Sequence, residues 1–207
     1  MEDPQLSDTA RVSEDMTALA SLERDAELMI RVREGDETSF ALLLNRHRGP
    51  VVHFLYRMVQ NQGVAEELGQ EVFLRVYKAR ATYEPTAKFT TWLFRIATHL
   101  ALNWLRDRKA EKSQDSIDDN SGDGPARELP DRSGTIEQKL VRDARLGEIR
   151  AAIEALPGKQ RAAVLMHKYE EMEYAQIAGA LGCSEPAVKS LLFRAYETLR
   201  ARLAHLV

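Results

Sequence analysis

The segment EYAQIAGALGCSEPAVKSLLFRAYETLR, residues 173–200, decides the fold of the C-terminal part of this chain. Its first half has helical spacing and ends near Gly182, and a second helix is predicted from Ser184, with Pro186 in the first turn. The small Ala178 stands where the two helices must cross, and Gly182 stands at a turn that requires a positive φ angle. These are the steric requirements of a helix-turn-helix, which we predict in preference to a plain helical hairpin.

The second predicted helix carries a large apolar ring on its polar side. Its apolar face consists of Val188, Leu191, Leu192, Ala195 and Leu199. Phe193 points away from this face, toward Lys189, Ser190 and Arg194. The N-terminal part of such a helix enters the DNA major groove, where cations bind guanine edges or phosphates and an aromatic ring can contact a thymine methyl group. We therefore expect these four residues to contact DNA; the alternative is that Phe193 packs on a neighbouring loop or protein.

The composition predicts a soluble globular protein with one large or two small domains. Of the 207 residues 44% are hydrophobic, and no apolar run reaches the roughly 18 residues of a membrane span. The N-terminus is acidic rather than basic and apolar, so we expect no signal peptide, no membrane insertion and a cytoplasmic protein. The single cysteine, Cys183, excludes an internal disulfide and a thiolate metal cluster. The net charge of −3 argues against nucleic-acid binding through overall charge, so local basic patches matter more.

A polar stretch separates two blocks of helical periodicity. Residues 112–134 contain almost no large apolar side chain and are rich in Asp, Ser, Gly and Pro, which is typical of a flexible linker. No segment alternates with the period of a β-strand. We therefore predict an all-α protein of two small helical domains joined by a flexible acidic linker, the second containing the helix-turn-helix. The predicted parts are a disordered acidic tail (1–20), a first helical domain (21–111), the linker (112–139) and the helix-turn-helix domain (140–207).

Glycine, proline and capping residues predict where helices end in the first domain. Gly35 ends one helix, and Asp36 is placed to cap the next. Gly49 and Pro50 are expected to break or kink that second helix. Two further helices are predicted roughly over residues 64–79 and 88–109.

The last of these helices has a mixed aromatic and cationic stripe beside its apolar face. The apolar face consists of Phe89, Leu93, Ile96 and Leu100. The adjoining stripe consists of Trp92, Arg95, His99, Asn103 and Arg106. An indole stacks on any base and arginine adds charge and stacking, so this stripe suits unstacked bases and their backbone. The alternative is a half-buried tryptophan among solvated arginines; a lone histidine does not indicate a metal site.

The preceding helix has an acidic face that includes an exposed leucine. The residues on this face are Glu67, Gln70, Glu71 and Leu74. Such a patch is more typical of a protein-docking surface than of a DNA-binding one, the alternative being an ordinary solvated helix side.

Three segments, in this order and spacing, resemble a known family. They are EELGQEVFLRVYK, FTTWLFRIATHLALNWLRDRK and LPGKQRAAVLMHKYEEMEYAQIAGALGCSEPAVKSLLFRAYETLR. Together they resemble a bacterial RNA polymerase sigma factor of the small, two-domain extracytoplasmic-function (ECF) type, and the resemblance covers the chain after about residue 21. It implies a subunit that binds core RNA polymerase, recognises and melts promoter DNA, and starts transcription of a stress or envelope regulon.

The resemblance also assigns roles to particular residues. It implies that Glu67, Gln70, Glu71 and Leu74 bind the clamp helices of the largest polymerase subunit. It implies that Tyr83 and the loop 82–88 lie beside a flipped base of the minus-ten promoter element, with Trp92, Arg95, His99, Asn103 and Arg106 along the melted strand. It implies that the minus-thirty-five element is read by Pro186, Lys189, Ser190, Phe193 and Arg194. In the family the linker threads through polymerase, and sequestration by an anti-sigma factor is common.

Two other classes of protein explain the sequence less completely. A helix-turn-helix regulator that binds operators by itself would explain residues 173–200, but it leaves the tryptophan stripe and the acidic face without a role. An enzyme is disfavoured because the sequence has no glycine-rich phosphate loop, no nucleophile elbow and no histidines at metal-ligand spacing. We expect no catalytic residue, no metal and no cofactor.

Overall fold

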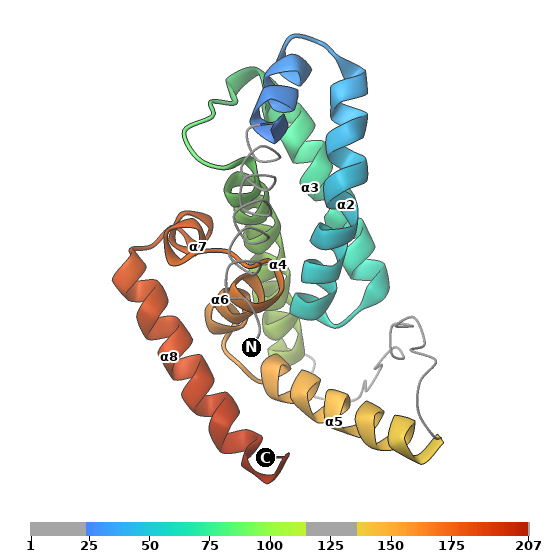
Figure 1. Ribbon diagram of the computed structural model, residues 1–207, viewed down its shortest axis with the longest axis vertical. Coiled ribbons are helices and arrows are strands. Elements are labelled where there is room, and N and C mark those ends of the chain that lie inside the picture. Colours follow the sequence, from blue (N-terminus) through green and yellow to red (C-terminus); the bar gives the residue numbers. More distant parts are fainter. Residues whose placement is uncertain (1–23, 115–135, 207) are drawn as a thin grey trace, which may run out of the picture.

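The computed structural model describes residues 24–114 and 136–206, and within these ranges the regular structure is entirely helical. A helix over residues 24–33 is followed by α2 (Glu37–Val59), α3 (Gln62–Lys78), η1 (Ala79–Thr82) and α4 (Phe89–Gln114). The second region contains α5 (Ile136–Glu154), α6 (Gly158–Tyr169), α7 (Tyr174–Leu181), α8 (Glu185–Arg202) and η2 (Ala204–Leu206). Figure 1 shows these helices in chain order. The predicted all-α fold is therefore confirmed, whereas the predicted tail and most of the predicted linker lie outside the described residues.

Local signals in the first region place the start of α2. Gly35 has a φ of 99°, a conformation that L side chains rarely adopt, and it ends the preceding helix. The Asp36 carboxylate accepts hydrogen bonds from the backbone N–H groups of Thr38 and Ser39. The Ser39 hydroxyl also donates to it, and this bond lowers the pKa of Asp36. The predicted cap is confirmed.

The predicted break at Gly49 and Pro50 is wrong, because α2 continues through both residues to Val59. A proline inside a helix removes one backbone hydrogen bond, which normally favours a break. Here the residues that follow, Val51, Phe54 and Leu55, are fully buried. Their packing against the core outweighs the local cost of the proline.

The helix-turn-helix forms as its sequence predicts. Gly182 adopts the left-handed conformation at the end of α7, with φ 63° and ψ 43°. Glu173 and Gln176 form a reciprocal capping box at the start of α7, which satisfies backbone donors at that end. The buried face of α8 contains Val188, Leu192 and Ala195.

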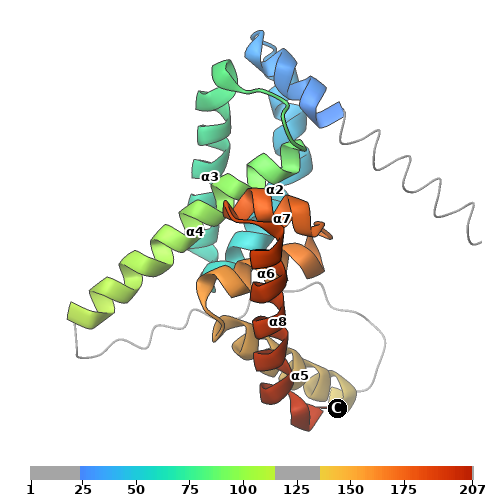
Figure 2. The ribbon, with the colours of Figure 1, turned by 90° about the vertical axis from the view of Figure 1, so that its left-hand side faces the viewer.

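The two regions share one continuous core. Buried side chains of α2 and α4 belong to the same apolar cluster as those of α6 and α7. In both views α7 lies against α4, and α6 lies close to α2 and α4 (Figures 1 and 2). We call this packing of α6 and α7 on α2 and α4 the closed arrangement. The sequence predicts the two helical units but not that they pack on each other.

No helix within residues 24–114 and 136–206 has the length and apolar character needed to cross a membrane.

Candidate nucleic-acid interface

The predicted DNA-reading residues lie together on the exposed side of α8. All five are exposed: Pro186, Lys189, Ser190, Phe193 and Arg194. The Phe193 side chain is 68% exposed, so it does not pack on another described segment. The Ser190 hydroxyl donates to the Pro186 carbonyl at 3.0 Å, and the Lys189 ammonium lies 5.9 Å from the centre of the Tyr174 ring. The surface combines two cations with an accessible aromatic ring, the chemistry expected of a major-groove helix.

An acidic depression lies beside the start of α8. It has a volume of about 690 Å³ and is lined by His167, Glu171, Met172, Glu173, Tyr174, Ala175 and Glu185. The carboxylates of Glu171, Glu173 and Glu185 make this depression acidic, a character that repels phosphate.

The predicted stripe on α4 is present and accessible. Arg95, His99, Asn103 and Arg106 are exposed, and Trp92 is half-buried. The opposite face of the helix is in the core, with Phe89 and Leu93 fully buried. The Trp92 ring centre lies 5.9 Å from that of Phe89, so the indole is partly packed and partly accessible.

Tyr83 is buried and packs against Trp92 of the α4 stripe. It is 4% exposed and its ring centre lies 5.0 Å from that of Trp92 and 6.3 Å from that of Phe89. Burial, together with the nearby Asp25 carboxylate, raises the pKa of Tyr83. Its hydroxyl has no hydrogen-bond partner among the described residues. The ring therefore packs against Phe89 and Trp92, where removal of apolar area from water outweighs the polar hydroxyl.

The acidic face of α3 is also present. Glu67, Gln70 and Leu74 are exposed, Leu74 by 45%, and Glu71 is partly exposed and pairs with Arg75 at 2.7 Å. The other side of α3 packs in the core through Val72 and Val76. This face and the α4 stripe are therefore separate surfaces of different chemistry.

Comparison with known proteins assigns the chain to a family. The family model for sigma-70 region 2 matches residues 43–111, and that for sigma-70 region 4 matches residues 146–199. RNA polymerase sigma factor CarQ of Myxococcus xanthus is 34% identical over 178 residues, which cover 86% of this chain and 97% of CarQ. The ECF RNA polymerase sigma-E factor of Escherichia coli (strain K12) is 31% identical over 187 residues, covering 88% of this chain and 96% of that protein.

The chain belongs to the ECF sigma factors of the sigma-70 family. This ECF sigma factor is thus a non-catalytic transcription initiation factor that directs RNA polymerase to promoters. Its fold is similar to that of CnrH, solved in complex with the cytosolic domain of CnrY, with a TM-score of 0.64 and 20% identity over 88% of this chain and 98% of that chain. The RpoE sigma factor of Bartonella quintana, solved with the anti-sigma factor NepR, gives a TM-score of 0.63 at 20% identity, covering 80% and 96%.

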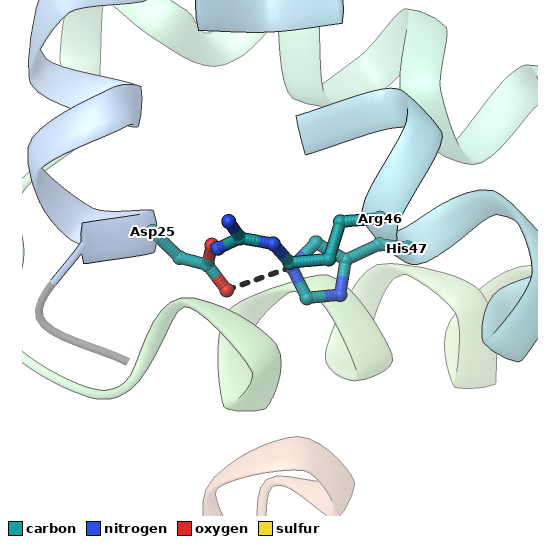
Figure 3. A network of polar contacts seen from close by, with 3 residues as sticks. All are labelled: Asp25, Arg46 and His47. Carbon is teal, nitrogen blue, oxygen red and sulfur yellow. Dashed lines mark hydrogen bonds and ion pairs between the residues drawn. The ribbon is translucent and has the colours of Figure 1, made fainter. Parts of the chain in front are cut away.

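A buried ionic group joins the first helix of this ECF sigma factor to α2, and the sequence analysis does not predict it. Asp25 is 2% exposed and lies 2.7 Å from His47 Nε2. It also accepts a hydrogen bond from Arg46, so α2 and the helix over residues 24–33 are joined through one carboxylate (Figure 3). The His47 ring lies 5.4 Å from that of Phe89, at the start of α4. The available signal was an aspartate at helical spacing with Leu28, Met29 and Val32 on an otherwise apolar face.

A buried cation, Arg161, was also missed. Arg161 precedes the apolar run 162–166 in α6 and is 7% exposed. Its guanidinium donates to the Met58 carbonyl in the first region and to the Glu154 and Leu156 carbonyls in the second. Burial lowers the pKa of Arg161. Sequence periodicity would have marked Arg161 only as a charged residue on the edge of an apolar helix.

Proposed function

We propose that this ECF sigma factor binds core RNA polymerase through α3, opens and holds the minus-ten element on α4, and reads the minus-thirty-five element with α8. The observation that carries the proposal is that one chain displays three separate surfaces: an acidic patch with an exposed leucine, an aromatic and cationic stripe, and a basic helix-turn-helix face. A protein that only binds duplex operators needs the last of these alone. The regulon is proposed to be one of stress or envelope genes.

The minus-thirty-five contact is assigned to α8 because the side chains in the first half of this helix are exposed on one side. Arg194 can donate to a guanine edge or a phosphate, and Phe193 can contact a thymine methyl group. Lysine lacks the planar fork of arginine, so Lys189 serves as a point charge toward phosphate or base. Pro186 and Ser190 complete the surface at the start of the helix.

The minus-ten contact is assigned to α4 because melted DNA needs stacking and charge together. Extruding a base costs a few kcal/mol, and stacking on an aromatic ring returns about 1–3 kcal/mol per base. Trp92 supplies the accessible ring, and Arg95, His99, Asn103 and Arg106 supply polar groups along the strand. In this proposal the buried Tyr83 packs against Trp92, with ring centres 5.0 Å apart, and the loop 82–88 faces the flipped base.

The α3 face is assigned to the clamp helices of the largest polymerase subunit. Glu67 and Glu71 supply negative charge and Leu74 supplies an apolar contact, a combination that suits a protein partner of complementary charge. An anti-sigma partner is proposed as well, and the solved complexes of CnrH with CnrY and of RpoE with NepR support it by analogy.

Run-off transcription tests the proposed function. Purified protein is added to fragmented genomic DNA with and without bacterial core polymerase, and transcript starts are mapped by sequencing. Starts that require both components, preceded by two common sequence elements, are the expected result. Absence of new starts with core polymerase, together with shifts of specific duplexes by the protein alone, would favour an independent helix-turn-helix regulator.

A further inference from the structure

A chain of ring contacts joins the Asp25 group to the start of the α4 stripe. The His47 ring centre lies 5.4 Å from that of Phe89, and the Phe89 ring centre lies 5.9 Å from that of Trp92. The Tyr83 ring closes the cluster, with its centre 5.0 Å from that of Trp92 and 6.3 Å from that of Phe89. Only Trp92 in this cluster belongs to the stripe, which stays accessible in the closed arrangement. The other three rings are buried in a close-packed interior, so a shift of any of them moves the packed side of the indole.

The Asp25 carboxylate acts on two members of this cluster. It accepts a hydrogen bond from His47 Nε2 at 2.7 Å (Figure 3). Because a carboxylate only accepts, Nε2 carries the proton, and the bond fixes the orientation of the imidazole ring. Burial and, to a smaller extent, the Asp25 charge raise the pKa of Tyr83, so the carboxylate lies near that phenol as well. One buried charge is therefore coupled to rings on both sides of the cluster.

The helix over residues 24–33 reaches Tyr83 at a second point. The Arg33 guanidinium donates to the Tyr83 carbonyl at 3.5 Å, a long and weak hydrogen bond. Asp25 and Arg33 lie about 12 Å apart along the helix, so its two ends act on the phenol and on the backbone of the same residue. Met29, between them, is fully buried in the core and fixes the helix in place. The position of Tyr83 is thus set from both ends of one helix.

An ionic group at this place is informative because apolar side chains could fill the same space. Asp25 is 2% exposed, and the transfer of a carboxylate out of water is unfavourable unless its partners are well placed. Replacement of a buried ion pair by packed apolar residues is often neutral or stabilising. Apolar packing is non-directional, however, whereas a hydrogen bond depends on angle and distance. The contribution that only the ionic pair can make is therefore the orientation of His47 and of the rings that touch it.

We infer that Asp25 is a positioning residue for the minus-ten contact, which holds the Trp92 indole at the angle needed to stack on an unpaired base. It acts through the His47 and Tyr83 rings. The inference rests on the proposed function of α4. Aromatic stacking requires an offset parallel arrangement, so a tilt of the indole weakens it. The helix over residues 24–33, to which no DNA contact is assigned, then becomes part of the device that holds melted DNA.

A double-mutant cycle in the holoenzyme, reconstituted from the full chain and core polymerase, tests whether Asp25 acts through Trp92. Asp25→Asn, Trp92→Leu and the two combined are compared for affinity to a fluorescent single-stranded oligonucleotide that carries the minus-ten element mapped by run-off transcription. Trp92→Leu is expected to weaken binding about tenfold or more, and Asp25→Asn about fivefold. The double variant should bind no more weakly than Trp92→Leu alone, because the ring through which Asp25 acts is then absent. Glu27→Gln, at an exposed carboxylate of the same helix, is the matched control and should leave the affinity unchanged.

Two further variants separate positioning from stability. Asp25→Leu combined with His47→Phe replaces the ionic pair by apolar side chains, a change that commonly preserves the fold. The positioning role predicts that this variant unfolds at about the same urea concentration as the unsubstituted protein but binds the oligonucleotide about fivefold more weakly. Tyr83→Leu should weaken binding to a similar extent, and Tyr83→Phe, which keeps the ring, should recover most of that loss. Circular dichroism verifies that each variant is folded before its affinity is compared, and the Tyr83 pair decides the matter if the apolar pair does not fold.

The outcomes distinguish failure of this inference from failure of the proposed function. Losses of affinity that add in the Asp25→Asn and Trp92→Leu double variant would show that Asp25 acts independently of the indole, and would overturn the inference. Full affinity in a folded variant that lacks the ionic pair, or in Tyr83→Leu, would overturn it as well. If the proposed function of α4 is wrong, Trp92→Leu itself will bind the oligonucleotide as tightly as the unsubstituted protein.

Discussion

At the scale of single residues, exposure separates side chains that can bind DNA from those that hold the site in place. Phe193 and Arg194 extend from α8 into solvent, whereas Tyr83 and Asp25 are buried in the first region. Substitutions in the first pair should therefore change DNA recognition, and those in the second should change stability first.

Arg194→Ala is expected to weaken transcription from the cognate promoter while leaving core binding intact. Loss of one arginine contact to a base edge costs about 1–3 kcal/mol, which corresponds to a roughly 5- to 150-fold loss of promoter affinity. Run-off yield and co-elution with core polymerase measure the two effects separately. Arg202→Ala, at the far end of the same helix, is the matched control. An unchanged yield for Arg194→Ala would remove this residue from the reading surface.

Asp25→Asn is expected to destabilise the first region. The substitution removes the carboxylate charge that pairs with Arg46 and His47, at a residue that is 2% exposed. Loss of this charge should lower the free energy of unfolding by about 2–4 kcal/mol. Urea denaturation followed by circular dichroism measures the change. Asp107→Asn, which removes a carboxylate from an exposed pair with Arg106, should have little effect. Equal stabilities of the two variants would contradict a structural role for Asp25.

At the scale of elements, each helix uses one side for the core and another for function. On α3, Val72 and Val76 are buried while Glu67 and Leu74 face solvent. This division allows the outer side to be changed without loss of the fold.

Charge reversal on α3 should separate docking from folding. Glu67→Lys with Glu71→Lys is expected to abolish association with core polymerase, because both carboxylates of the proposed docking face change sign. Gel filtration with core polymerase measures binding, and circular dichroism checks the fold. The control is Glu66→Lys, an exposed residue of the same helix outside that face. If the double variant still co-elutes, these carboxylates are ordinary solvated groups.

At the scale of the whole molecule, the contact between the regions contains a titratable group. Glu170, just after α6, is partly buried, and burial raises its pKa to about 7 from 4.5, opposed by the nearby Arg57. A folded-state pKa above the unfolded value means that the folded protein holds this proton more tightly. Stability from Glu170 is therefore complete below about pH 4.5 and declines as the pH rises through 7.

Glu170→Gln should remove this part of the pH dependence. Because glutamine stays neutral, the variant is expected to exceed the unsubstituted protein in stability by about 1–2 kcal/mol at pH 8, with the difference shrinking toward pH 5. Urea denaturation from pH 5 to 8 gives the comparison. Glu171→Gln, at an exposed neighbour, is the control. Parallel pH profiles for Glu170→Gln and the unsubstituted protein would show that Glu170 is not desolvated.

Local sequence rules predicted the elements well because they act over a few residues. The Asp36 cap, the Gly182 turn, the buried face of α8 and the exposed stripe on α4 all follow from spacing and side-chain chemistry. The local rule failed at Pro50, because burial of Val51, Phe54 and Leu55 outweighed a missing backbone hydrogen bond. It also gave no indication that Tyr83 is buried, since a tyrosine in a polar loop carries no local sign of the rings that cover it.

The sequence by itself determined the helices, their apolar faces, the helix-turn-helix and the family, because each depends on near neighbours or on motif order. The tertiary structure alone decided that Asp25 meets His47, that Arg161 reaches Met58, and that α7 packs on α4. The two hydrogen bonds join residues that are 22 and 103 positions apart in the sequence. No periodicity within one helix specifies a partner at such a separation. Their physical basis is the removal of complementary apolar and polar surfaces from water, which is defined only when the whole chain has folded.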